Sequence, residues 1–379
     1  MTDRLIIQNA QRIVIKIGST LLTEGSQGMI REKWLGTLAE DIVSLRRSGS
    51  EVVLVSSGAI AVGRGRLGLR RQILKLEEKQ AAAAVGQIQL AHVYQEILRI
   101  HGLTVAQLLL TLGDTEERRR YLNARNTMET LFRCDAVPLV NENDTVATEE
   151  IRFGDNDRLA ARVAEMAGAD LLILLSDTDG FYTADPKVEP SATHIERVVE
   201  ITAEIEQMAG VSQSSFGAGG MITKLQAAKI AVNAGCDVLV TEGKRHNPIS
   251  ALDRGARCTW FVAPQSPMTA RKRWIANNLR PAGSLKVDKG AKSALSEGKS
   301  LLPPGVVAVD GEFSRGDAVI VLDEDGTQIG LGICAYSSVD ARRIIGHKSS
   351  EIARILGYSG REEMIHRDDL SLSTIDSRG

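Results

Sequence analysis

The sequence lacks the features of secreted, membrane-spanning and disulfide-stabilised proteins. Its four cysteines lie far apart and form no paired motif, so neither a disulfide framework nor a zinc site is indicated. No run approaches the ~20 apolar residues of a membrane-spanning helix. The first ten residues include Asp3 and Arg4 and contain no apolar core of signal-peptide length. We therefore expect a cytoplasmic protein with no protein-built metal site and no membrane partner.

Aromatic side chains and excess positive charge are also scarce. Phe, Trp and Tyr make up 4% of the chain, and the formal net charge is -2 at pH 7. Nucleic-acid-binding proteins usually present a basic surface and aromatic rings on which bases stack. The composition as a whole therefore gives no reason to expect nucleic acid, and a polyanionic partner would need a local basic patch.

The composition that is present fits a globular protein with more than one core. The chain has 379 residues, of which 43% are hydrophobic and 25% charged, and this length predicts two or three domains. In its first two thirds, strand-like apolar runs alternate with helical patterns, which predicts a three-layer αβα sandwich with a mainly parallel central sheet. The expected strands are 12–17, 51–55, 104–110, 136–140, 171–175 and 236–241.

The pattern changes between Ala263 and Ala282, where three prolines flank a basic segment. Beyond it, short strand-like runs follow one another closely and are separated by glycine turns, which predicts a small β-rich domain. The last residues are polar, as is typical of an unstructured tail. We expect a first domain over 1–265, a linker over 266–281, the β-rich domain over 282–365 and the tail over 366–379.

One polar loop, from Val140 to Arg158, directly follows a buried apolar run. The loops after parallel strands are where open α/β sheets bind their ligands. Two clusters in this loop, Asn141 to Asp144 and Asp155 to Asp157, offer acceptors for an ammonium group and amide donors for a carboxylate. Those are the two functions needed to hold an amino acid. The alternative is a solvated acidic loop whose Asn and Asp residues serve turns and helix caps.

Three further loops place lysines or small residues where a phosphate group would bind. Lys16 ends the first strand beside Gly18, and its ammonium group can meet phosphate oxygens. The segment Ser56 to Gly63 follows the second strand, and Phe216 to Lys224 puts glycines before a helix that contains a lysine. Each loop alone has an ordinary explanation: a surface lysine, close helix packing or a common glycine-rich turn.

Taken together, six motifs resemble the amino acid kinase family. They are Lys16-Ile17-Gly18, Ser56-Ser57-Gly58-Ala59, Asn141-Glu142-Asn143-Asp144, Gly154-Asp155-Asn156-Asp157, Tyr182-Thr183-Ala184-Asp185-Pro186 and Gly219-Gly220-Met221-Ile222-Thr223-Lys224. The resemblance runs from Arg12 to about Asp368, and Phe313 to Asp317 and Gly346 to Ser349 look like the PUA domain that bacterial members carry. One departure is Ala218, where the family usually has threonine, so a side-chain contact to nucleotide is in question there.

The resemblance implies ATP-dependent phosphorylation of the side-chain carboxylate of L-glutamate to L-glutamyl 5-phosphate, the first step of proline biosynthesis. It also implies feedback inhibition by proline, which shares the α-carboxylate and ammonium of glutamate but has no carboxylate to receive phosphate. A side-chain carboxylate with a pKa near ~4.3 is already ionised at neutral pH, so the reaction needs no general base. It needs positive charge where two anions meet.

The same resemblance assigns roles to particular residues. Lys16 and Lys224 are expected to flank the transferred phosphoryl group, with Asp157 holding both lysines. The residues expected to bind glutamate are Ser57, Asp144 and Asn156, with Asn141 nearby. Those expected to bind ATP are Ser176, Asp177, Ala218, Gly219, Gly220, Met221, Ile222, Thr223 and Lys224. Mg²⁺ is expected as the cofactor that accompanies ATP, held mainly by phosphate oxygens and water.

The expected partners are glutamate, ATP, proline, further copies of the chain in a dimer or tetramer, and a glutamyl phosphate reductase as functional partner. One alternative is another family member that phosphorylates acetylglutamate, aspartate or UMP, although such members do not share the Asn-Glu-Asn-Asp and Gly-Asp-Asn-Asp pairing. RNA binding through the PUA domain is the alternative from a different class. The basic residues 271–273 beside Trp274, together with Arg342 and Arg343, support it, whereas the net charge opposes it.

Overall fold

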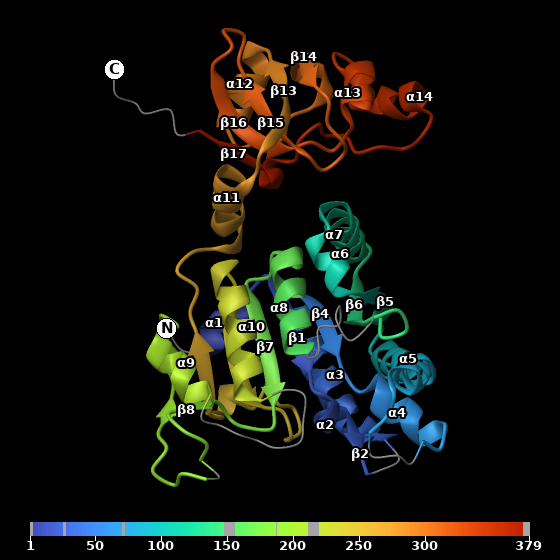
Figure 1. The fold of residues 1–379 in the computed structure, drawn as a ribbon, viewed down its shortest axis with the longest axis vertical. Helices are drawn as coiled ribbons and strands as arrows, with labels where there is room; N and C mark the ends of the chain where they lie inside the picture. The colour runs from blue at the N-terminus through green and yellow to red at the C-terminus, as the bar shows by residue number, and fades with distance from the viewer. Residues whose placement is uncertain are drawn as a thin grey trace. The chain divides into compact units, whose positions relative to one another are not determined.

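The computed structural model describes residues 3–25, 28–69, 73–147, 156–186, 188–210 and 220–373 (Figure 1). The chain divides into two compact units, Met1–Pro267 and Met268–Gly379. None of the helices in these described ranges is both long enough and apolar enough to span a bilayer.

The first unit contains an eight-stranded sheet. In their order across the sheet, its strands are β10 (Arg197–Val198), β12 (Cys258–Phe261), β11 (Asp237–Glu242), β7 (Leu171–Ser176), β1 (Arg12–Ile17), β4 (Glu51–Ser56), β6 (Ala136–Glu142) and β5 (Thr104–Leu110). The six strands from β11 to β5 run parallel, whereas β12 is antiparallel to β11 and parallel to β10. The prediction of a mainly parallel sheet is confirmed.

Helices cover both faces of this sheet. They are α1 (Asp3–Asn9), α2 (Ser19–Leu22), α3 (Glu32–Arg47), α4 (Ala59–Arg66), α5 (Leu76–Arg99), α6 (Leu112–Glu116), α7 (Arg118–Arg133), α8 (Asn156–Ala167), α9 (Ala203–Gly210) and α10 (Met221–Asn233), with the 3₁₀ turn η1 (Leu252–Arg254). Two short hairpins complete the unit, formed by β2 (Thr23–Glu24) with β3 (Met29–Ile30) and by β8 (Phe181–Tyr182) with β9 (His194–Ile195).

The central strands are apolar on both sides because successive side chains point to opposite faces. On β1, Val14 belongs to a core with α7, α8 and α10, while Ile13 and Ile15 belong to a second core with α3 and α5. On β7, Leu172 and Leu171 divide between the same two cores. This division establishes the three layers of the predicted αβα sandwich.

Arg12, at the first position of β1, joins several elements at the amino edge of the sheet. Its guanidinium donates to Glu51 Oε2 at 2.7 Å, to Glu129 Oε1 at 2.8 Å and to the carbonyl oxygen of Ala167, and it lies 4.2 Å from the ring centre of Phe132. Burial lowers the pKa of Arg12, but the two glutamates outweigh it and the net pKa is raised. The cation therefore ties β1 to β4, α7 and α8.

The second unit is built on a five-stranded sheet. Across it lie β14 (Val306–Gly311), β13 (Pro281–Val287), β15 (Ala318–Leu322), β16 (Gln328–Ile333) and β17 (Leu370–Leu372). Only β13 and β15 pair in parallel among these described strands. The accompanying helices are α11 (Pro267–Asn278), α12 (Lys289–Ser296), α13 (Ser338–Ile344) and α14 (Ile352–Leu356), with 3₁₀ turns η2 (Pro303–Gly305), η3 (Ser349–Glu351) and η4 (Arg367–Asp369). A separate apolar core confirms the predicted β-rich domain.

The structure corrects the predicted boundaries of this second unit. The expected linker contains α11, and β13 begins at Pro281. The prediction of an unstructured tail from residue 366 is wrong for the part that the structure describes, because β17 pairs with β16 and Leu370 is buried. Asp369, also buried, accepts a hydrogen bond from Arg271 at 2.6 Å. A three-residue edge strand carries too short an apolar pattern to be recognised in a polar segment.

We predict that Arg12→Met destabilises the first unit by about 2 kcal/mol, because several buried or half-buried acceptors lose their cation. Urea unfolding followed by tryptophan fluorescence measures this, since Trp34 and Trp260 are buried in the unit. The control is Arg99→Met, which removes an exposed ion pair with Glu96 and should leave the urea midpoint near that of the wild type. Equal shifts in the two variants would contradict the role assigned to Arg12.

Candidate active site

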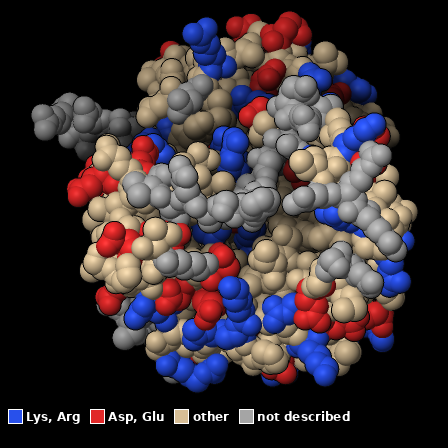
Figure 2. Space-filling model, turned by 60° about the horizontal axis from the view of Figure 1, so that its bottom comes forward, with Lys and Arg blue, Asp and Glu red and all other residues tan. Residues whose placement is uncertain are grey.

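The predicted site loops meet at the carboxyl edge of the eight-stranded sheet. Ile17, the last residue of β1, pairs in register with Ser56 at the end of β4 and with Leu175 near the end of β7. Leu110 on β5 pairs with Glu142, the last residue of β6. These strand ends lie along one edge of the sheet. The arrowhead of β7 marks this edge near the bottom of Figure 1, and Figure 2 views the molecule from below, where Lys and Arg atoms are visible in a hollow near the middle.

Three residues predicted to be catalytic meet at this edge. Lys16 on β1 places its Nζ 2.5 Å from Oδ1 of Asp157 on α8, and Lys224 on α10 places its Nζ 3.2 Å from Oδ2 of the same carboxylate. Lys16 and Lys224 are each 6% exposed, and Asp157 is fully buried. The fold thus brings one carboxylate between two lysines that are far apart in the sequence.

Asp157 stays ionised because the two lysines outweigh its burial. Burial raises the pKa of the Asp157 carboxyl, but the ammonium groups of Lys16 and Lys224 lower it by more, and the net pKa is below the ordinary value. The stabilisation from this carboxylate is therefore present above the ordinary Asp pKa of ~3.9 and is lost as the pH falls through the lower folded-state pKa. The three groups carry one net positive charge, so an arriving anion would be favoured.

Two glycines lie in the loops beside this charge. Gly18 precedes α2, and a Cβ at this position would lie 3.8 Å from the Lys16 ammonium nitrogen. Gly58 has a φ of +96°, which favours glycine, and the Cβ of any replacement would lie 3.7 Å from Ser19 Cα. The loops after β1 and β4 therefore lie against each other beside the lysine.

The structure also supports the helix-packing explanation for one of the small residues after β4. A Cβ at Gly63 on α4 would lie 1.7 Å from the carbonyl oxygen of Ala82 on α5, and a Cβ at Gly86 would lie 1.8 Å from that of Ala59. The two helices cross in backbone contact at these glycines. Within this segment, Gly58 thus shapes the loop and Gly63 packs the helix.

Several predicted substrate-binding residues form a cluster of side-chain amides. Asn156 donates from Nδ2 to the carbonyl oxygen of Ser56 at 2.6 Å and to Asn141 Oδ1 at 2.9 Å. Asn141 is buried and donates from Nδ2 to Gln87 Oε1 at 2.6 Å. Ser57 follows directly after Ser56, and its backbone N–H donates to Ile17 O at 3.1 Å. We call Gln87, Asn141 and Asn156 the amide cluster.

Gln87 was missed by reasoning from the sequence. It lies on α5, and none of the six motifs includes it. The available signal was its place on the packed face, between buried Ala83 and Leu90 at helical spacing. A second glutamine on this helix, Gln80, donates to the carbonyl oxygen of Ala147 at 3.1 Å. Gln87 therefore connects α5 to β6, and Gln80 connects α5 to the segment that follows β6.

Asp144 lies in the turn after β6 and is half-buried. The turn is anchored by a hydrogen bond from Asn143 N to Leu110 O at 2.8 Å and by one from Ala147 N to Asn143 O at 3.1 Å. Asp155, which the sequence placed in the second cluster of this loop, is outside the described residues. The structure thus brings Asn141, Asn156 and Ser57 together, and it places Asp144 on the adjoining turn.

The predicted nucleotide-binding residues Ser176 and Asp177 are at the end of β7. Ser176 is buried, and its Oγ accepts a hydrogen bond from Thr178 N at 3.3 Å. Asp177 is exposed, and its carbonyl oxygen accepts a hydrogen bond from Lys244 Nζ at 3.4 Å. The segment that follows β11 therefore borders this strand end.

The remaining predicted nucleotide-binding residues surround the start of α10. Gly220 precedes the helix, and Met221, Ile222 and Thr223 form its first turn. Thr223 Oγ1 donates to Gly220 O at 2.8 Å and lies 3.2 Å from Asp157 Oδ2. The first turn of α10 therefore adjoins the lysine pair. The remaining two predicted residues, Ala218 and Gly219, lie outside the described residues.

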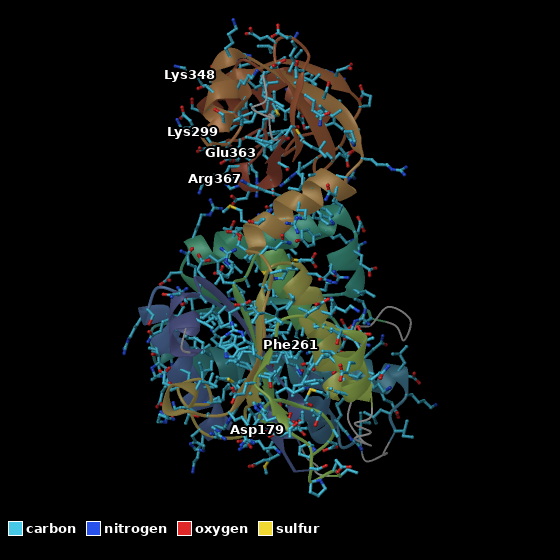
Figure 3. All side chains as sticks on the ribbon, turned by 90° about the vertical axis from the view of Figure 1, so that its left-hand side faces the viewer. Asp179, Phe261, Lys299, Lys348, Glu363 and Arg367 are labelled. Carbon is cyan, nitrogen blue, oxygen red and sulfur yellow. The ribbon has the colours of Figure 1, made fainter. Side chains whose placement is uncertain are left out.

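A polar contact that the sequence did not indicate lies next to this edge. Asp179, labelled in Figure 3, accepts a hydrogen bond at Oδ1 from the hydroxyl of Tyr182 at 2.8 Å. Arg257 donates to the same hydroxyl oxygen at 2.9 Å. The motif that begins at Tyr182 is therefore held by a residue that lies 75 positions away in the sequence.

Sequence comparisons identify the class of protein. The profile of the amino acid kinase family matches residues 11–242, and that of the PUA domain matches residues 283–356. The chain belongs to the amino acid kinase family, and its second unit contains a PUA domain. The resemblance based on the six motifs is confirmed.

Curated relatives are similar over nearly the whole chain. Glutamate 5-kinase from Rhodopseudomonas palustris (strain TIE-1) is 58% identical over 97% of this chain and 98% of its own length. Glutamate 5-kinase from Paramagnetospirillum magneticum (strain ATCC 700264 / AMB-1) is 57% identical over 95% of this chain and 97% of its own. Among solved structures, carbamate kinase from Giardia lamblia bound to AMP-PNP is 17% identical, covers 67% of this chain and 99% of its own, and has a TM-score of 0.49. The two 5-kinases match both units, including the PUA domain.

We predict that Asp157→Asn lowers the free energy of unfolding by about 3 kcal/mol or more, because it leaves two buried ammonium groups without their counterion. Adding Lys224→Met to this variant removes one of those charges and should recover part of the loss. Denaturant unfolding of the two single variants and the double variant measures the coupling. Strictly additive losses would contradict the electrostatic account.

Proposed function

We propose that this protein phosphorylates the side-chain carboxylate of L-glutamate with ATP, giving L-glutamyl 5-phosphate and ADP in the first step of proline biosynthesis. Residues 1–265 form the proposed kinase domain, and the PUA domain, whose profile matches residues 283–356, lies in the second unit. The observation that carries the proposal is a buried lysine pair on one carboxylate, beside a cluster of side-chain amides at the same sheet edge. The curated relatives named glutamate 5-kinase support it over nearly their full length.

The reaction brings two anions together without moving a proton. A carboxylate oxygen of glutamate attacks the γ-phosphorus of ATP, the bond from that phosphorus to the β,γ-bridging oxygen breaks, and ADP leaves. Lys16 and Lys224 supply the positive charge that this step needs, and Asp157 holds both in place. A third nearby anion would oppose the reaction, and Asp157 does not act as one because each of its oxygens contacts a lysine.

Mg²⁺ enters this scheme as part of the ATP substrate. It would be held mainly by phosphate oxygens and water, and it neutralises charge on the triphosphate. The residues near the transferred group fit a metal ion held by ATP and water, because the Asp157 carboxylate is already engaged by two ammonium groups. The catalytic charge that belongs to the protein itself is therefore that of the lysines.

ATP would bind along the carboxyl end of β7 and the start of α10. Ser176 and Asp177 would border the nucleotide, and the start of α10 would face its phosphates, since the first backbone N–H groups of a helix favour anions. At Ala218 only the backbone can contribute, because the family's usual threonine hydroxyl is missing. Glutamate would bind at Ser57, Asn141, Asp144 and Asn156, on the other side of the lysine pair.

The product is an acyl phosphate, which water and other nucleophiles attack readily. A reductase that consumes glutamyl phosphate is therefore the proposed functional partner. End-product control by proline follows from the same binding chemistry. Proline offers an α-carboxylate and an ammonium group but no acceptor for phosphate, so it would occupy the recognition part of the site without reacting.

RNA binding through the second unit is not proposed. Three of the four arginines that supported this alternative have partners in the described part of the unit: Arg271 pairs with Asp369, Arg342 with Glu312 and Arg343 with Asp340. Figure 3 labels residues of both signs on one side of the unit, among them Lys348 and Glu363. These three arginines therefore take part in ion pairs within the domain.

We predict that Lys224→Met lowers kcat by about 10²-fold or more, because it removes one positive charge from the transferred phosphoryl group. Its control is Lys229→Met on the same helix, where the lysine is exposed and pairs with Glu206. That variant should keep wild-type turnover. ADP release with glutamate and ATP measures both, and the unfolding midpoint confirms that each variant folds. Near-normal turnover in Lys224→Met would refute the role of this lysine.

We predict that proline inhibits competitively with glutamate. Asp144→Ala should weaken the binding of both ligands by about tenfold or more, because both present an ammonium group to the same carboxylate. The control is Val146→Ala in the same turn, whose side chain is 57% exposed. Initial rates over a matrix of glutamate and proline concentrations give both constants. Inhibition that no glutamate concentration reverses would place the effector site elsewhere.

A further inference from the structure

Helix α5 contributes one side chain to the amide cluster. Gln87 lies one helical turn after Ala83 and one before Leu90, both buried, so its position follows from the packing of the helix. Its Oε1 accepts the hydrogen bond from Asn141 Nδ2 at 2.6 Å. No motif of the family resemblance includes this residue.

Two backbone groups fix the orientation of every amide in the cluster. The N–H of Glu142 can only donate, and it lies 2.9 Å from Asn141 Oδ1, so Nδ2 of Asn141 faces Gln87. The carbonyl of Ser56 can only accept, and it lies 2.6 Å from Asn156 Nδ2. The chain of donors therefore runs from Asn156 to Asn141 and from Asn141 to Gln87.

This order determines what Asn156 offers to a ligand. Both hydrogens of its Nδ2 are used, one by Ser56 O and one by Asn141 Oδ1. Its Oδ1 receives no donor from the described part of the chain. Both acceptor sites of Asn141 Oδ1 are already taken, by Glu142 N and by Asn156. Of these two side-chain oxygens in the described part of the chain, Oδ1 of Asn156 is the one that can still accept a hydrogen bond. It therefore fits a ligand group that donates hydrogen bonds.

We propose that Gln87 is a positioning residue for recognition of the substrate's α-ammonium group. It fixes Asn141, whose oxygen in turn fixes Asn156 with Oδ1 as the group that accepts from the ammonium. Gln87 itself does not touch the substrate. The inference rests on the proposed function, because it takes the ligand at this cluster to be an amino acid.

Gln87 can be changed in ways that separate its hydrogen bond from its volume. Gln87→Leu keeps a similar size but leaves the Nδ2 of Asn141, which is 2% exposed, without its acceptor. Gln87→Glu retains an acceptor oxygen. Gln89 on the same helix accepts an exposed hydrogen bond from Arg66 Nε at 3.3 Å, so Gln89→Leu is the matched control.

The experiment measures initial rates of the full-length chain and these variants with glutamate and ATP, and it adds glutarate, which lacks the α-ammonium, as a competitor. We expect Gln87→Leu to raise KM for glutamate about tenfold while KM for ATP stays within about twofold. Gln87→Glu should restore KM for glutamate to within about threefold of the wild type. Glutarate should inhibit the wild type and Gln87→Leu to the same extent, or inhibit neither of them.

Three results would overturn the proposal: an unchanged KM for glutamate in Gln87→Leu, equal increases for glutamate and ATP, or a loss of glutarate competition as large as the loss for glutamate. Gln87→Ala replaces Gln87→Leu if the unfolding midpoint shows that the leucine variant does not fold. Wild-type protein that releases no ADP in response to glutamate would instead refute the proposed function. The two failures are therefore distinguishable.

Discussion

The attachment of helix α8 to strand β1 at both ends is the constraint on which the site depends. At one end Lys16 pairs with Asp157 in the first turn of the helix, and at the other Arg12 donates to the carbonyl oxygen of Ala167, its last residue. A carboxylate at a helix N-terminus and a cation at its C-terminus are the arrangement that the helix dipole favours. From Asp157 to Ala167 the helix rises about 15 Å over ten residue steps, and from Arg12 to Lys16 the strand advances about 13 Å over four steps, so both contacts can form together.

Because α8 is held in this way, Lys224 on the neighbouring helix α10 can also reach Asp157. Helices α8 and α10 pack beside each other, and each carries buried alanines in the same apolar core, among them Ala160 and Ala164 on α8 and Ala227 and Ala228 on α10. Side chains this small let two helices approach closely. Lys224 then reaches the carboxylate that Lys16 already contacts. The electrostatic centre is therefore a consequence of helix packing as well as of sheet topology.

Much of this arrangement could be predicted from the sequence, because strand ends are visible as apolar runs that stop at polar residues. That rule placed Lys16, Ser57 and Asn141 at or just after strand ends, and the structure brings these strand ends to one edge of the sheet. The partners that hold these residues could not be predicted in the same way. Gln87 and Arg257 are single polar residues in unremarkable surroundings, and only the packing of distant segments reveals what they contact. Residues 370–372 were missed because a short edge strand buries too little apolar surface to leave a pattern.

In the proposed site, the groups for recognition are separate from the groups that carry charge, and this separation follows from the kinds of group that the fold places there. The amide cluster is neutral, so it can orient a ligand through the direction of its hydrogen bonds without altering the local potential. The lysine pair and Asp157 carry the net charge, which acts on any nearby anion regardless of its orientation. A carboxylate and a triphosphate repel each other, so the charge must be strongest between them. In the proposed site, side-chain amides orient the amino acid without adding an anion near the reacting atoms, and the Asp144 carboxylate would contact the ammonium group of the substrate.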